Sequence, residues 1–199
     1  MRFCFGIIVL TALLNGVAAA QAPPAPPPPV REYTPDAWKE FTSAAGKFSI
    51  SLPGTPKPEV RTMETGLGKL TTHAFLLQTN YGHYYVHYVD FPIGPETPQE
   101  HKEFLDGARD QVVSGGARVL AETDFSMGGI AGRELLVEKG LLIIRARYFF
   151  VKSRSYQIIF STLPDAVFKN GKPSANAADR TDLFEMVSKK FFGSFKVIE

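Results

Sequence analysis

The sequence contains almost no cysteine. The one cysteine among its 199 residues is Cys4, which lies ahead of an apolar stretch near the N-terminus. We interpret this stretch as part of a signal peptide, so the mature chain is expected to hold no cysteine. Disulfide bonds, thiolate metal ligands and cysteine nucleophiles are then excluded from its chemistry.

The N-terminal apolar stretch is too short to cross a membrane. It runs from Phe3 to Leu14, whereas a spanning helix needs about 20 apolar residues. Arg2 precedes it and the alanines at 18–20 follow it, which is the pattern of a signal peptide. We predict a signal peptide at residues 1–20 that is cleaved after Ala20, and an exported protein of the periplasm or the extracellular medium. No integral membrane span is expected after leader cleavage.

The sequence also lacks an excess of charge of either sign. It holds 22 Lys and Arg against 20 Asp and Glu, and the leader carries one of these cations and no acid. A nucleic-acid-binding protein usually has a strongly basic balance, so no nucleic-acid partner is expected. Hydrophobic residues make up 44% of the chain, with 16 Phe and 7 Tyr. This content favours a folded core over a disordered chain.

Proline is concentrated behind the predicted leader. Residues 21–30 hold six prolines in ten positions, and proline has a fixed φ and no backbone N–H. We predict a Pro-rich linker at 21–33, extended as polyproline II with a reach of roughly 30 Å over these ten positions, and a single α+β domain at 34–199. The linker is interpreted as a solvated tail, or as a stalk if the leader stays uncleaved.

The rest of the chain alternates strand and helix patterns. Thr34 and Pro35 predict a short helix with Trp38 and Phe41 on one face. Thr97 and Glu100 form the pattern of a capping box at the start of a second helix, and a third is predicted at about 178–192. Alternating runs bounded by turns predict strands at 47–52, 58–64, 69–79, 82–91, 117–125, 130–139, 141–151 and 155–162.

This order of elements resembles the PsbP-like fold family. The residues that carry the resemblance are Trp38 and Phe41 ahead of the strand at 46–53, the hairpin residues Tyr148 and Tyr156, and the closing segment 192–196. The resemblance implies a central antiparallel β-sheet with helices packed on it, an α/β/α sandwich. It also implies non-catalytic roles, such as extrinsic photosystem subunits and partner-binding adaptors.

The strand predicted at 82–91 has an unusual composition, with four tyrosines, two histidines and a carboxylate in residues 81–90. Strand alternation places His83, Tyr85 and His87 on one face. The two histidines would then lie about 13 Å apart at 3.3 Å per residue, too far to share one zinc ion. We interpret the segment as an amphipathic, partly exposed aromatic strand. The alternatives are a ligand or partner surface, or a metal site completed by His73 from the neighbouring strand.

Two further motifs are ambiguous. Arg145 and Arg147 alternate with Lys152 and Arg154 along one predicted hairpin, which indicates a solvated face or a basic stripe for an anionic partner. The glycine-rich run at 128–132 leads into a strand, whereas a phosphate-binding loop leads into a helix. We therefore predict a turn there.

The leading hypothesis is an exported, non-catalytic binding or interaction module of the cell envelope. No serine stands in a nucleophile-elbow motif, and no cofactor or metal site is predicted. The partner would be an unidentified envelope protein or ligand, and the candidate binding residues are His83, Tyr85, His87, Arg145 and Arg147. The alternative is an envelope hydrolase that uses His83 or His87 with a carboxylate such as Asp90 or Asp106.

Overall fold

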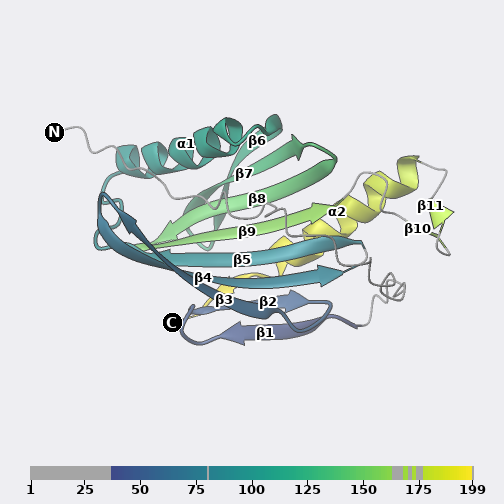
Figure 1. The fold of residues 1–199 in the computed structure, drawn as a ribbon, viewed down its shortest axis with the longest axis horizontal. Helices are drawn as coiled ribbons and strands as arrows, with labels where there is room; N and C mark the ends of the chain where they lie inside the picture. Colours follow the sequence, from purple (N-terminus) through teal and green to yellow (C-terminus); the bar gives the residue numbers. More distant parts are fainter. Residues whose placement is uncertain (1–36, 80, 163–167, 170–171, 174–176, 199) are drawn as a thin grey trace, which may run out of the picture.

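A seven-stranded antiparallel sheet forms the centre of the protein in the computed structural model, which describes residues 37–79, 81–162, 168–169, 172–173 and 177–198 (Figure 1). Its strand order is β3-β4-β5-β9-β8-β7-β6. The strands predicted from residue 58 to 162 are confirmed to within two residues at each end. Their bounds are β3 (Lys57–Thr65), β4 (Gly68–Thr79), β5 (Gly82–Asp90), β6 (Arg118–Met127), β7 (Ile130–Lys139), β8 (Leu142–Val151) and β9 (Arg154–Thr162).

A smaller sheet contains β1 (Lys39–Ser43), β2 (Phe48–Leu52) and β12 (Lys196–Val197), in the order β1-β2-β12. The predicted short helix is wrong from Trp38 onward, because Phe41 lies in β1 and pairs with Ile50 of β2. Pairing with β2 supplies backbone partners for this segment and sets the Phe41 ring against Phe48 and Phe75. This packing outweighs the local helix signal. Residues 34–36 lie outside the described residues.

Two short strands form a separate hairpin, β10 (Phe168–Lys169) with β11 (Lys172–Pro173). They fall in the stretch 164–177, most of which lies outside the described residues. The glycine-rich run is a turn, as predicted. Gly128 and Gly129 have φ values of 58° and 84°, a left-handed conformation that glycine adopts without steric cost, and they join β6 to β7.

Both longer helices are confirmed. α1 (Pro98–Ser114) begins with the predicted capping box, in which the Glu100 backbone N–H donates to the Thr97 hydroxyl and the Thr97 N–H donates to the Glu100 carboxylate. α2 (Ala177–Gly193) precedes the last strand. No helix in the described part of the chain is both long and apolar enough to cross a lipid bilayer.

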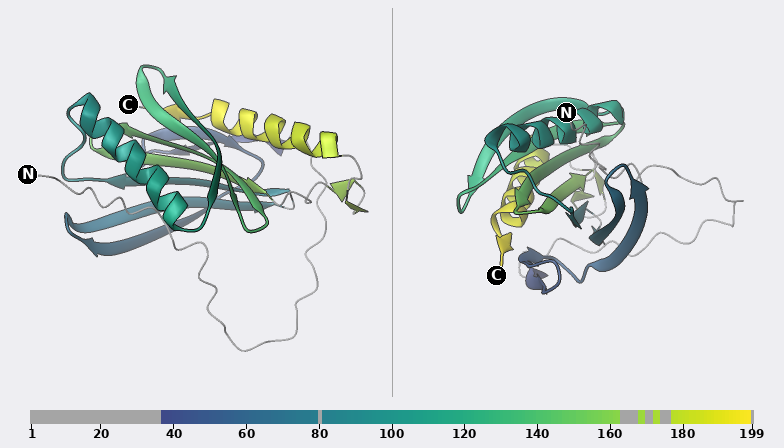
Figure 2. Two further views of the ribbon diagram at one scale, coloured as in Figure 1. Left: turned by 90° about the horizontal axis from the view of Figure 1, so that it is seen from above. Right: turned by 90° about the vertical axis from the view of Figure 1, so that its left-hand side faces the viewer.

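The two helices cover opposite faces of the large sheet (Figure 2). Phe104, Leu105 and Ala108 of α1 pack with Leu135 and Ala146 on one face. On the other face, α2 and the small sheet pack against alternate residues of β5, β8 and β9. The protein therefore has the α+β fold that the sequence predicted, with a central antiparallel sheet and helices packed on it.

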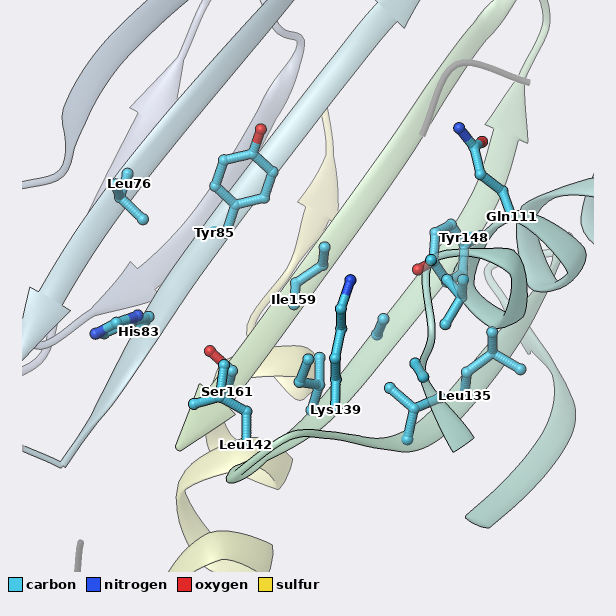
Figure 3. Close-up of a pocket in the computed structure, with 16 residues that line it drawn as sticks. Leu76, His83, Tyr85, Gln111, Leu135, Lys139, Leu142, Tyr148, Ile159 and Ser161 are labelled. Carbon is cyan, nitrogen blue, oxygen red and sulfur yellow. The ribbon is translucent and has the colours of Figure 1, made fainter. Parts of the chain in front are cut away.

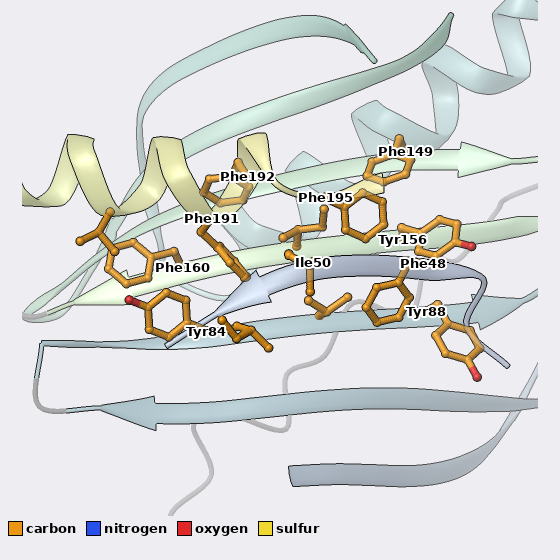
Figure 4. Close-up of a cluster of buried hydrophobic side chains, with 14 residues drawn as sticks. Phe48, Ile50, Tyr84, Tyr88, Phe149, Tyr156, Phe160, Phe191, Phe192 and Phe195 are labelled. Atoms are coloured by element: carbon orange, nitrogen blue, oxygen red, sulfur yellow. The ribbon is translucent and has the colours of Figure 1, made fainter. Parts of the chain in front are cut away.

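The core beneath α2 is dominated by aromatic side chains. The rings of Phe191 and Phe192 are directed from α2 toward the strands that carry Tyr84 and Phe160 (Figure 4). The Tyr156 hydroxyl donates to the Gly46 carbonyl oxygen at 2.8 Å, which ties the small sheet to β9. Offset and edge-on ring contacts of this kind add to the stabilisation from burial.

Phe48 is expected to be a main support of this core. Its side chain is fully buried and contacts the rings of Phe41, Phe75, Tyr156 and Phe195. Phe48→Ala should lower the free energy of unfolding by about 3–5 kcal/mol, measured by chemical denaturation. Ile93→Ala is the control, because Ile93 is 65% exposed, and it should change stability by no more than about 0.5 kcal/mol. Equal effects of the two substitutions would contradict the assignment.

Candidate ligand-binding site

A cavity lies on the face of the large sheet that carries α1. The helix packs on β7 and β8, and the opposite wall of the cavity is formed by residues of β4, β5 and β9. Figure 3 shows Leu76 and Tyr85 on one side of this space and Gln111 of α1 and Leu135 on the other. Its volume is about 370 Å³, within the range of small-molecule sites.

The wall of the cavity is mainly apolar. Its polar side chains are those of His83, Tyr85, Gln111, Lys139, Tyr148 and Ser161, and none of the 16 described residues that line it is an Asp or Glu. The apolar part includes Leu76, Leu135, Val137, Ile144, Ala146 and Ile159. A site of this composition suits an apolar ligand body held by a few polar contacts.

Strand β5 places His83, Tyr85 and His87 on one face, as alternation predicts. His83 and Tyr85 line the cavity, whereas His87 does not and is 1% exposed. The expectation of a partly exposed strand is wrong for the stretch from Tyr84 to Val89, which is buried on both faces. The reason is that β5 lies in the middle of the large sheet, between β4 and β9, with α2 and the small sheet packed on one of its faces.

The imidazoles do not gather at a common point. His73 pairs with Tyr88 rather than with His87, and its ring stacks on Tyr88 at 4.7 Å on the face opposite to His87. The described residues contain no cluster of three or more His, Cys, Asp and Glu side chains that could hold a metal ion.

His87 is a buried polar group with unusual surroundings. Neither of its ring nitrogens has a hydrogen-bond partner among the described residues, and the same holds for the side-chain oxygen of Gln157, which pairs with His87 across β5 and β9. Burial lowers the pKa of His87 to about 4. The adjacent Gln157 amide opposes this shift, although the two side chains do not have the geometry of a hydrogen bond. The ring is therefore neutral at neutral pH and stacks on Tyr85, with centroids 6.0 Å apart.

Arg145 and Arg147 lie on the other face, beneath α2, and not with His83 and Tyr85. Arg145 donates to the Glu185 carboxylate at 2.6 and 2.9 Å and to the Ser188 hydroxyl at 2.8 Å. Arg147 donates to Glu134 at 2.7 Å and lies over the rings of two phenylalanines. The predicted basic stripe on a wet face is wrong, since acidic side chains neutralise both guanidinium groups and a helix covers this face.

The residues of the hydrolase alternative do not converge either. Asp90 points to the face opposite to His83 and His87, where both carboxylate oxygens accept from Arg154 at 2.6 and 2.7 Å. Asp106 accepts from Arg133 and from Lys102, each at 2.6 Å. These hydrogen bonds, led by that from Arg133, lower the pKa of Asp106. Both carboxylates are thus committed to ion pairs.

Lys139 lines the cavity, but the sequence alone did not identify it as a candidate binding residue. It continues the register of Leu135 and Val137, which face α1 from β7. A lysine at an inward-facing position was the available signal, because lysine side chains are seldom placed against an apolar layer without a purpose. Gln111 and the other α1 residues required knowledge of how the helix packs.

The protein resembles cyanobacterial PsbP in fold. The solution structure of PsbP (CyanoP) from Synechocystis sp. PCC 6803 matches with a TM-score of 0.49 and 13% identity, over 85% of this chain and 99% of that chain. A crystal structure of a protein of unknown function from Pseudomonas aeruginosa, described as a putative regulator, matches with a TM-score of 0.33 and 8% identity, over 77% and 95% of the two chains. The predicted resemblance is thus present as a modest likeness of fold.

Comparison by sequence gives no match. No protein-family model matches the chain, and no curated protein matches it.

His87 should make stability depend on pH. Its pKa rises from about 4 in the folded protein to an ordinary value near 6.5 on unfolding, so the unfolded chain binds more protons between these values. The contribution of the buried, neutral His87 ring to the free energy of unfolding is complete above pH 6.5 and is lost as the pH falls toward 4. From pH 7 to pH 5 the loss amounts to about 2 kcal/mol. Denaturation of the wild type and of His87→Phe at both pH values isolates this effect, and equal pH dependence of the two proteins would refute it.

Proposed function

We propose that this protein is a non-catalytic binding protein of the cell envelope that holds a small, largely apolar ligand in the cavity beside α1. The observation that carries the proposal is the cavity itself, with its volume of about 370 Å³ and its wall of aliphatic and aromatic side chains. Export rests on the signal-peptide pattern of residues 1–20.

An apolar cavity of this size has an energetic reason to be occupied. Protein interiors are otherwise close-packed, and unfilled apolar cavities lower stability in proportion to their volume. Apolar cavities also bind apolar molecules in preference to water, because water finds too few polar partners in them. A ligand that fills the space would regain the contacts that the wall lacks.

Exposed apolar side chains next to the lining residues support the same proposal. Val113 follows the lining residue Val112 in α1 and is 44% exposed, and Leu141 precedes the lining residue Leu142 and is 77% exposed. Exposed apolar residues that adjoin lining residues in the chain favour contact with an apolar partner, such as the source that delivers the ligand.

Filling the cavity should abolish ligand binding without unfolding the protein. Ala146 is buried in the wall, and Ala146→Leu would place additional carbon atoms in the open space. We expect the affinity for the neutral fluorescent probe N-phenyl-1-naphthylamine to fall about tenfold or more, with an unchanged or higher melting temperature, since cavity-filling substitutions often stabilise proteins.

The matched control is Ala121→Leu, because Ala121 lies on the exposed edge strand β6. Its affinity for the probe should equal that of the wild type in the same fluorescence titration. Undiminished probe binding by a folded Ala146→Leu protein would place the site elsewhere, and absence of binding by the wild type would contradict a binding function for the cavity.

A further inference from the structure

The charges around the cavity indicate which class of ligand it takes. We infer that the ligand is a single-chain amphiphile with a carboxylate head group, whose chain lies in the cavity and whose head group contacts the ammonium of Lys139. This inference rests on the proposed function and adds to it the chemistry of the head group.

Lys139 is a cation without a matching anion. It forms no ion pair or hydrogen bond with any described residue, and none of the described residues that line the cavity is an Asp or Glu. Most arginines of the described residues are, by contrast, paired with carboxylates, namely Arg118, Arg133, Arg145, Arg147 and Arg154. A half-buried ammonium beside an apolar wall lacks the compensation that these arginines have. A carboxylate would supply it through a charge-assisted hydrogen bond.

His83 does not supply a competing charge at neutral pH. Its ring lines the cavity from β5, and partial burial lowers its pKa from the ordinary value. The imidazole is then neutral, and the positive charge of the wall comes from Lys139. Tyr85 and Tyr148 are also uncharged, because burial raises the pKa of both hydroxyls.

Lys139 has one further neighbour, the end of α1. Its Nζ atom lies 3.4 Å from the position that a Cβ atom on Gly115 would occupy, and this position is 3.3 Å from the carbonyl oxygens of Gln111 and Val112. A cation there also interacts favourably with the C-terminus of the helix. A purely structural role would affect stability but would not distinguish acidic from neutral ligands, so ligand selectivity separates the two roles.

The size of the cavity suggests the length of the chain. A volume of about 370 Å³ lies near the lower end of the range for small-molecule sites, so the cavity suits a short chain rather than a long one. Decanoic acid is such a molecule and is ionised at neutral pH. Decanol matches its chain without the charge, and decylamine carries the opposite charge.

The experiment measures competition of these three compounds with N-phenyl-1-naphthylamine on the full chain at neutral pH. Decanoate should bind about tenfold or more tightly than decanol, since hydrogen bonds to charged groups are strong enough for this difference, and decylamine should bind most weakly. Lys139→Met should remove the preference for decanoate and leave the decanol affinity unchanged, whereas Lys139→Arg should retain the preference.

Lys39→Met is the matched control, because Lys39 is exposed on β1 in the small sheet, and it should behave as the wild type. Melting temperatures of all variants show whether loss of the α1 contact has unfolded the protein. Equal affinity of the wild type for decanoate and decanol, or an unchanged preference in Lys139→Met, would overturn the inference while the proposed function stands. Failure of all three compounds and the probe to bind would overturn both.

Discussion

The architecture depends on the need to cover both faces of a seven-stranded sheet. At about 4.8 Å between strands, the sheet is about 30 Å wide, whereas a single helix with its side chains is about 10 Å across. One face is covered by α2 together with the three-stranded sheet, and aromatic side chains fill the space between them and the large sheet. On the other face α1 packs mainly on β7 and β8, held to β7 by the ion pair of Asp106 with Arg133. The cavity lies beside the C-terminal end of α1, over the part of this face that the helix does not cover.

The same requirement explains why the arginines of β8 are not available to a ligand. Arg145 and Arg147 alternate with the residues that face α1 and so point toward α2. There Arg145 is bound by Glu185 and Ser188, and Arg147 by Glu134. Such pairs add little to stability where they are exposed, but the pair of Arg145 with Glu185 joins α2 to the sheet. The two arginines beneath α2 are therefore paired with carboxylates. Lys139, on the other face, has no ion-pair partner among the described residues.

The sequence predicted features that depend on local order and missed those that depend on distant contacts. Alternation and turn residues located the strands of the large sheet, and Thr97 with Glu100 located the start of α1. The pairing of Phe41 with β2 depends on residues outside the local pattern. That pattern alone predicts a helix for the segment. In β5, the near-continuous apolar and aromatic run from Tyr84 to Val89 is typical of a strand buried on both faces. That reading would have removed His87 from the candidate surface.

Side-chain volume differs between the two faces of β8 and β9. These strands present large rings to the face of α2, including Phe149, Tyr156 and Phe160, whereas the cavity is lined by Ala146, Ile159 and Ser161 together with one ring, Tyr148. A larger residue at Ala146 would close much of the space without altering the strand pattern. Because close packing is the general rule for protein interiors, the small side chains of Ala146 and Ser161 account for part of the open space that the proposed ligand would fill. The ammonium of Lys139, which has no ion-pair partner among the described residues, lies in the wall of the cavity. A packing defect alone does not account for a charged side chain at this place.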